Sequence, residues 1–167
     1  MPKADKLYLV GFMGAGKTTL ARALAARIGW KPVDVDEWIE QRERRTIADI
    51  FRERGEPYFR AIEREAVRAL VAERHLVVAT GGGTFVDPDS RATLLADGTV
   101  VWIDVPLPVI LERVPSDGRR PLAADRAAFE ALYLARCAAY RSAHIRLDGT
   151  QGQPGDLVER LLDRLGW

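Results

Sequence analysis

"GFMGAGKTT", residues 11–19, follows the apolar run LYLV at residues 7–10 and fits the pattern G-x-x-x-x-G-K-[ST]. Glycines in such a loop let backbone N–H groups turn toward phosphates, and the N-terminus of the next helix adds partial positive charge. An apolar strand before the loop and an amphipathic helix at residues 20–28 supply the context that the pattern requires. A chance glycine-rich turn is the alternative. We favour a nucleotide-phosphate loop in which Lys17 reaches the β- and γ-phosphates and Thr18 ligates magnesium.

Short apolar runs alternate with amphipathic stretches along the rest of the chain, which predicts an α/β domain with a doubly wound parallel sheet. The predicted strands are Lys6–Val10, Pro32–Asp34, Leu76–Thr80, Thr99–Val105 and His144–Leu147. Helix starts are predicted at Thr46 (ending at Gly55), Pro57, Asp87-Pro88 and Pro154. Ligands of such sheets bind beyond the carboxyl ends of the strands.

Composition narrows the classes of protein that fit. At 167 residues the chain is most simply one domain, residues 1–167, and 25 Lys and Arg against 24 Asp and Glu give no bulk attraction to nucleic acid or anionic membranes. We find no signal-peptide pattern and no apolar stretch near the ~20 residues of a membrane helix. A single cysteine, Cys137, excludes an internal disulfide framework and is expected in the core. We therefore expect a cytoplasmic protein with no membrane or nucleic-acid partner.

The stretch "VDVDEW" places two carboxylates, Asp34 and Asp36, two residues apart at the end of the second strand. Their side chains would point the same way if the strand persists. Beside a phosphate loop they suit magnesium and a substrate hydroxyl. The alternative is that Asp36 caps a helix from Glu37 and that Asp34 is solvated.

The third strand closes on three glycines, Gly81 to Gly83, where an ATPase of this architecture often has a magnesium-binding aspartate. Residues without side chains let the backbone approach a ligand closely. A flexible turn is the alternative. Asp104, at the end of the fourth strand, is a competing candidate for the metal.

Two arginines stand out among many. Arg60 lies beside the buried stripe of its helix, with Glu63 one turn on to hold its guanidinium, and Arg141 follows Tyr140 near the end of a long helix. For any one arginine in so arginine-rich a chain, a solvated surface charge is the ordinary alternative. Residues 115–126, "PSDGRRPLAADR", are polar and doubly basic, which predicts a mobile loop able to fold over a polyphosphate.

The order of motifs resembles the shikimate kinase family. The matching motifs are "GFMGAGKTT", "DVDEWIE", "TIADIF", "GEPYFRAIE", "TGGGTF", "RRPL" and "YR". The phosphate loop alone is unspecific, but the combination in this order is specific, and it spans nearly the whole chain. The resemblance implies a P-loop, nucleoside-monophosphate-kinase-like fold with a five-stranded parallel sheet, a helical substrate-binding region at residues 35–65 and a lid at residues 115–125.

The resemblance also implies an activity, the transfer of the ATP γ-phosphate to the 3-hydroxyl of shikimate, on the route to chorismate, with Mg²⁺. It implies catalytic roles for Lys17, Asp36 and Arg120, and a metal site at Thr18 and Asp34. The implied nucleotide-binding residues are Gly14, Ala15, Gly16, Lys17, Thr18, Thr19, Arg113, Arg120 and Pro154, of which Arg113 and Pro154 would sandwich adenine. The implied shikimate-binding residues are Asp36, Arg60, Gly81, Gly82, Gly83 and Arg141, with the two arginines on the carboxylate. We expect a monomer.

Two other functions fit the phosphate loop. A gluconate-type kinase of the same fold would share it but should not need "FR-x-IE" and the distal "YR" together. A nucleotide switch or ATPase would couple hydrolysis to a partner, yet the sequence has no N-K-x-D guanine-reading motif and its third strand ends in glycines.

Overall fold

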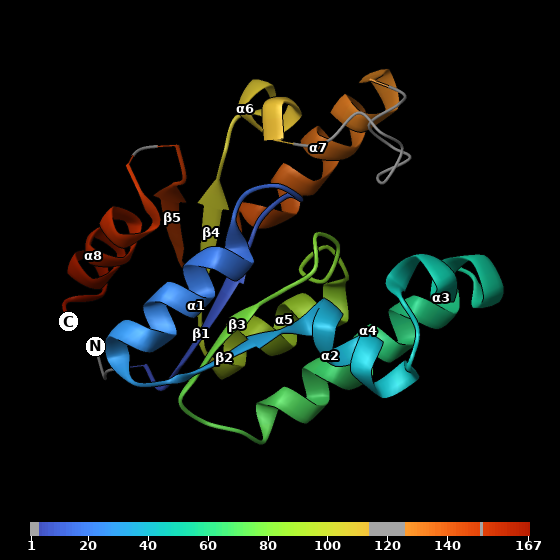
Figure 1. Cartoon of the computed structure of the whole chain (residues 1–167), viewed down its shortest axis with the longest axis horizontal. Coiled ribbons are helices and arrows are strands. Elements are labelled where there is room, and N and C mark those ends of the chain that lie inside the picture. Colours follow the sequence, from blue (N-terminus) through green and yellow to red (C-terminus); the bar gives the residue numbers. More distant parts are fainter. Residues whose placement is uncertain (1–3, 114–125, 151) are drawn as a thin grey trace.

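A computed structural model describes residues 4–113, 126–150 and 152–167 of the chain. Strands and helices alternate along it (Figure 1). The elements are β1 (Lys6–Val10), α1 (Lys17–Ile28), β2 (Lys31–Asp34), α2 (Val35–Glu43), α3 (Ile47–Arg54), α4 (Glu56–Val71), β3 (Leu76–Ala79), α5 (Pro88–Asp97), β4 (Thr99–Asp104), α6 (Leu107–Arg113), α7 (Arg126–Tyr140), β5 (Ile145–Asp148) and α8 (Pro154–Leu165). The five predicted strands are confirmed, each boundary within one residue of the predicted one.

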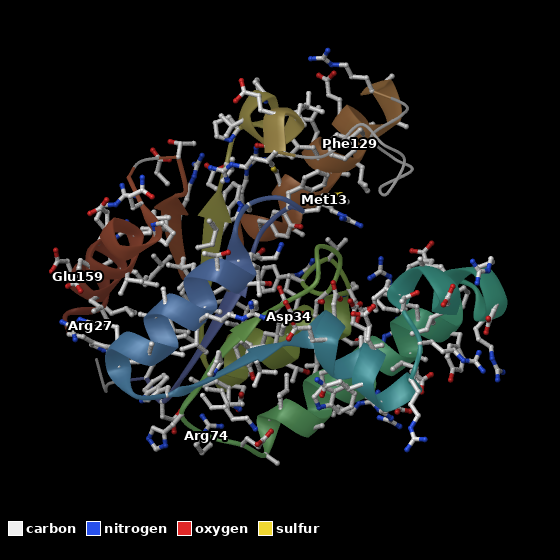
Figure 2. All side chains as sticks on the ribbon, in the orientation of Figure 1. Met13, Arg27, Asp34, Arg74, Phe129 and Glu159 are labelled. Carbon is white, nitrogen blue, oxygen red and sulfur yellow. The ribbon has the colours of Figure 1, made fainter. Side chains whose placement is uncertain are left out.

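The strands form one parallel sheet in the order β2-β3-β1-β4-β5. The chain moves from β1 outward to β2, then returns across β1 to β4. Because crossovers between parallel strands are right-handed, this reversal puts α1 on one face of the sheet and α4 and α5 on the other. On the first face α1 packs against α8, where Arg27 donates to Glu159 at 2.9 Å (Figure 2).

Local sequence accounts for the burial of the central strand and for the ends of two helices. The strand residues Leu7 to Val10 are fully buried, as expected for a central strand covered on both faces. The Thr46 hydroxyl accepts from the backbone N–H of Asp49 at 3.1 Å and begins α3, and Gly55 ends it. The Asp87 carboxylate caps α5 in the same way, so the predicted starts of these two helices are confirmed.

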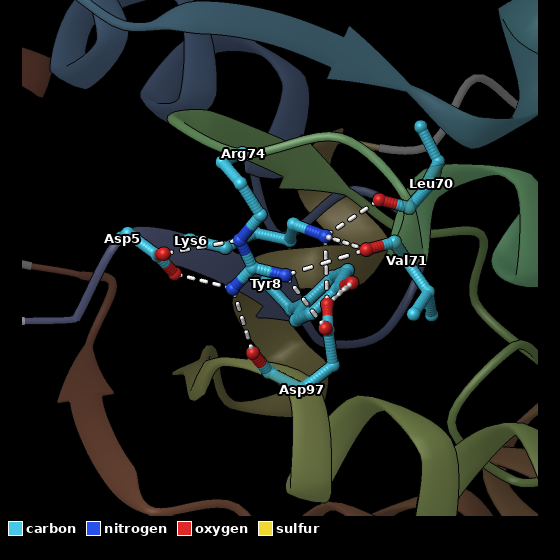
Figure 3. A network of polar contacts seen from close by, with 7 residues as sticks. All are labelled: Asp5, Lys6, Tyr8, Leu70, Val71, Arg74 and Asp97. Carbon is cyan, nitrogen blue, oxygen red and sulfur yellow. Dashed lines mark hydrogen bonds and ion pairs between the residues drawn. The ribbon is translucent and has the colours of Figure 1, made fainter.

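The amino end of the sheet is held by a buried ionic network (Figure 3). Lys6 has no exposed side-chain surface, and its Nζ donates to the Leu70 carbonyl at 2.5 Å and to Asp97 at 2.7 Å. Asp97 also accepts from the Tyr8 hydroxyl at 2.5 Å and from Arg74 at 2.9 Å. The network ties the ends of α4 and α5 to β1, which leaves the carboxyl end of the sheet for ligands.

No helix among the described residues combines the length and the apolar character needed to cross a membrane.

Candidate functional site

The phosphate loop joins β1 to α1 at the carboxyl end of the sheet. Gly16 has φ 93°, a left-handed conformation that glycine adopts without strain, and it caps the N-terminus of α1. Lys17 begins that helix, and its buried Nζ donates to the carbonyls of Gly11 at 2.6 Å and Phe12 at 3.1 Å. The lysine therefore lies folded over the loop in which phosphates are expected to bind.

Asp34 ends β2 and faces α1 (Figure 2). One of its carboxylate oxygens accepts from the Thr18 hydroxyl at 2.5 Å, and the other accepts from the backbone N–H of Glu37 at 3.0 Å. Asp34, not Asp36, is thus the cap of α2, and the sequence-based alternative that assigned the cap to Asp36 was wrong. The strand also stops at Asp34, so the premise that both carboxylates share one strand face was wrong as well.

The pair formed by Thr18 and Asp34 fits a magnesium ion. A hydroxyl and a carboxylate are the hard oxygen donors that Mg²⁺ prefers, and nucleotide phosphates and water commonly supply its other ligands. No cluster of three or more His, Cys, Asp or Glu side chains able to hold a metal occurs in the described part of the chain. The competing candidate, Asp104, is held instead by Arg146 at 2.7 Å.

Asp36 lies in the first turn of α2 beside the glycine segment. A Cβ on Gly81 would lie 2.8 Å from its Oδ1, so any side chain at Gly81 would push this carboxylate out of its place. Burial, followed by the negative charges of Asp34 and Glu63, raises the pKa of Asp36 from 3.8 to about 6. Lys17 acts in the opposite direction. The pKa of this carboxylate therefore lies close to neutral pH, as a proton acceptor requires.

Arg60 is fixed by its own helix and by the residue after the glycines. Its Nη1 donates to Glu63 at 2.9 Å, and buried Glu63 also accepts from the Thr84 hydroxyl at 2.9 Å. A Cβ on Gly83 would lie 2.6 Å from Arg60 Nη1, so the guanidinium lies directly on the backbone of Gly83. The predicted contact between Arg60 and Glu63 is confirmed; Thr84 was not predicted.

The structure does not bring Arg141 to this cluster. Arg141 is exposed and follows the last residue of α7. Its place is taken by Arg136, whose Nη1 lies 2.8 Å from the position of a Cβ on Gly82. The Arg136 guanidinium lies 5.6 Å from the Phe12 ring centre, and burial lowers its pKa. Of these two arginines, it is therefore Arg136 that lies beside the glycines.

A signal for Arg136 was present in the sequence. Phe129 and Tyr140 mark the buried face of α7, and Arg136 lies seven residues after Phe129 and four before Tyr140, spacings that share a helical face. An arginine on a buried helical face is rare enough to single out. The choice of Arg141 instead followed from its position beside Tyr140 in "YR".

A separate cavity of about 260 Å³ adjoins the phosphate loop. Its lining brings together Gly16, Arg113 of α6 and Pro154 of α8, which are distant in sequence. Arg113 donates to the Gly14 carbonyl at 3.2 Å. The cavity thus joins the two residues expected to sandwich adenine to the loop expected to hold phosphates. Arg120 and the expected lid lie outside the described residues.

The family model and the curated relatives agree on one family. The family model for shikimate kinase matches residues 13–166. A curated relative, the shikimate kinase of Persephonella marina, is 39% identical over 160 residues, which cover 95% of this chain and 98% of that protein. The structure of shikimate kinase from Acinetobacter baumannii in complex with shikimate has 36% identity and a TM-score of 0.91, covering 96% of this chain and 92% of that one. That of Aquifex aeolicus shikimate kinase has 33% identity and a TM-score of 0.89, covering 96% of each chain. With its five-stranded parallel sheet and phosphate loop, this chain belongs to the shikimate kinase family of P-loop kinases.

Proposed function

We infer that this protein transfers the γ-phosphate of ATP to the 3-hydroxyl of shikimate, giving shikimate 3-phosphate and ADP on the route to chorismate and the aromatic amino acids. The observation that carries the inference is the convergence of Arg60, Arg136 and Asp36 on the segment Gly81–Gly83. Two guanidinium groups complement a carboxylate, and a third, acidic group complements a hydroxyl. A small hydroxylated acid meets both requirements.

The substrate would lie against the glycine backbone. Arg60 and Arg136 contact Gly83 and Gly82, so a carboxylate held between their guanidinium groups would place the ring over the glycines. Asp36, which adjoins Gly81, would then face a hydroxyl of that ring. Because Glu63 holds Arg60 and the Phe12 ring packs on Arg136 before the substrate arrives, little side-chain freedom is lost on binding.

The chemical step needs positioning and charge neutralisation more than covalent help. The 3-hydroxyl oxygen attacks the γ-phosphorus, the bond from that phosphorus to the β,γ-bridging oxygen breaks, and ADP leaves with the bond's electron pair. Asp36 orients the hydroxyl and accepts its proton, which its raised pKa favours. Lys17, now donating to Gly11 and Phe12, is placed to donate to the β- and γ-phosphates instead.

Thr18 and Asp34 would hold Mg²⁺ together with the nucleotide. When bound, the ion neutralises charge on the phosphate oxygens. Gly14 to Thr19 would surround the phosphates, and Arg113 and Pro154 would enclose adenine in the cavity that they line. Arg120 would add positive charge from the lid. We further propose that the protein acts as a cytoplasmic monomer.

The test is ADP release by the purified protein with ATP and Mg²⁺, measured without an acid substrate, with shikimate and with gluconate. Shikimate should raise the rate far above the other two conditions. Equal stimulation by gluconate would favour a kinase that accepts a broader range of hydroxy acids. Rapid ADP release without any acid would favour an ATPase. A methyl ester of shikimate should be a poor substrate, because it removes the negative charge that Arg60 and Arg136 are proposed to bind.

A further inference from the structure

The carbonyl groups of the glycine segment have different partners. Those of Gly81 and Gly83 accept from nearby backbone N–H groups, of Thr84 at 3.2 Å and Val86 at 3.1 Å. The carbonyl of Gly82 accepts from the hydroxyl of Tyr140. The first two bonds are local turns, whereas the third comes from α7, 58 residues along the chain.

Tyr140 can hold this bond in one place. The residue has no exposed surface, and its ring packs on Trp102 of β4 with 6.0 Å between ring centres. Burial raises the pKa of Tyr140, so the hydroxyl keeps its proton and acts as the donor. A tyrosine whose ring is enclosed this way has a fixed hydroxyl position.

The same helix contacts Gly82 a second time. Arg136 lies one turn before Tyr140, and its Nη1 lies 2.8 Å from the position of a Cβ on Gly82. Gly82 therefore has two contacts with α7: the Tyr140 hydroxyl donates to its carbonyl, and the Arg136 guanidinium packs beside its Cα. Both contacts come from α7, so they fix the position of that helix relative to the glycines.

We propose that Tyr140 is a positioning residue for substrate binding: its bond to Gly82 holds the glycine backbone in the place against which Arg136 packs. The proposal rests on the function inferred above. Without the hydroxyl, Gly82 would keep the wide conformational freedom of glycine, and its peptide plane could rotate away from Arg136. The second arginine would then meet the substrate carboxylate in a less constrained geometry.

The decisive variant is Tyr140→Phe, which keeps the ring on Trp102 and removes one hydroxyl. A net hydrogen bond is worth about 0.5–1.5 kcal/mol, so KM for shikimate should rise about 2- to 12-fold. KM for ATP and kcat should change by less than about twofold. Among the described residues, no hydrogen bond joins Tyr140 to the phosphate loop or to Asp36.

Tyr133→Phe is the matched control. Tyr133 lies on the same helix, and its hydroxyl donates to another backbone carbonyl, that of Val105, at 2.9 Å. This variant removes a hydroxyl that bonds away from the glycines and keeps the ring on Phe12, so it should lower thermal stability and leave KM for shikimate unchanged. An equal rise in KM in both variants would show general loosening of α7 and overturn the proposal.

Two further measurements separate a positioning role for Tyr140 from a purely structural one. In an Arg136→Ala background, Tyr140→Phe should raise KM by less than about twofold, since the group it positions is gone; a full effect there would overturn the proposal. Amide hydrogen exchange of residues 80–86, measured without ligands, should quicken in Tyr140→Phe and not in Tyr133→Phe. If the wild-type protein showed no shikimate-dependent ADP release, the proposed function would fail, and this exchange measurement would still decide whether Tyr140 holds Gly82.

Discussion

The hydroxyl of Thr18 donates to Asp34 at 2.5 Å, which joins the first turn of α1 to the last residue of β2. Asp34 has a second task, because its other oxygen caps α2 through the N–H of Glu37. The Asp34 side chain therefore fixes where α2 begins and also faces the proposed metal site.

Asp34→Asn separates these two tasks. Asparagine caps helices as well as aspartate does, so the fold should survive, but a neutral amide is a weaker ligand for Mg²⁺. We expect the Mg²⁺ concentration at half-maximal activity to rise and the unfolding temperature to change little. Titration of activity against Mg²⁺ checks the first expectation, and thermal unfolding checks the second. An unchanged Mg²⁺ requirement would remove Asp34 from the metal site.

Asp36→Asn should lower kcat by roughly 10²-fold or more, the usual scale of acid–base help, because the amide cannot accept the proton. In the wild type, kcat/KM should fall as pH drops through about 6, where Asp36 becomes protonated. The variant should lose this dependence. A pH profile of both proteins makes the comparison, and a profile shared by the two would exclude Asp36 as the proton acceptor.

The same substitution should stabilise the fold at neutral pH. Because the pKa of Asp36 is raised from 3.8 to about 6, folding disfavours the ionised form, and the wild type loses stability as pH rises across that range. Asparagine carries no charge at any pH. Thermal unfolding of both proteins at acidic and neutral pH should therefore show a gain for the variant that appears only at the higher pH.

Arg60→Ala and Arg136→Ala should each raise KM for shikimate roughly 10- to 150-fold, since a hydrogen bond to a charged group contributes about 1.5–3 kcal/mol. KM for ATP should stay near the wild-type value. Arg141→Ala is the matched control, with the same chemistry on an exposed residue just beyond α7. If Arg141→Ala raised KM as much as Arg136→Ala, the corrected assignment would be wrong.

Lys17→Ala should leave the fold intact and nearly abolish transfer, because Lys17 is placed among the expected phosphate positions. Its bonds to the carbonyls of Gly11 and Phe12 are lost as well, so the circular-dichroism spectrum and the unfolding temperature belong in the same experiment. A wild-type spectrum with undiminished ADP release would contradict the role.

The sequence predicted most of the fold because its strands and caps are local features. The apolar run before "GFMGAGKTT" and the capping residues Thr46 and Asp87 act within a few residues of themselves, and all are found as expected. The sequence-based prediction put Arg141 beside the glycines, where the structure has Arg136; a side chain at a helix end is placed by tertiary packing. A shift from residue 141 to 136 changes the helical face, and motif order alone does not resolve it.

The turn at Asp34 was missed for a related reason. A strand continuing to Asp36 and a helix beginning at Val35 are both compatible with "VDVDEW", and in the structure Asp34 ends the strand and caps the helix through the N–H of Glu37. The raised pKa of Asp36 arises first from burial by tertiary packing and then from the charges of Asp34, within the motif, and Glu63, on α4. The burial of Asp36 is the part that the motif itself does not encode.

The crowding at the three glycines couples these positions to the side chains that face them whenever the pocket changes during evolution. A methyl group at Gly82 or Gly83 would meet the guanidinium of Arg136 or Arg60 at 2.8 or 2.6 Å. A side chain there would force the facing guanidinium to shift away from the glycine backbone, which would disturb the proposed carboxylate contact. Laboratory selection for a neutral acceptor should therefore vary positions 60 and 136 together with the facing positions 83 and 82.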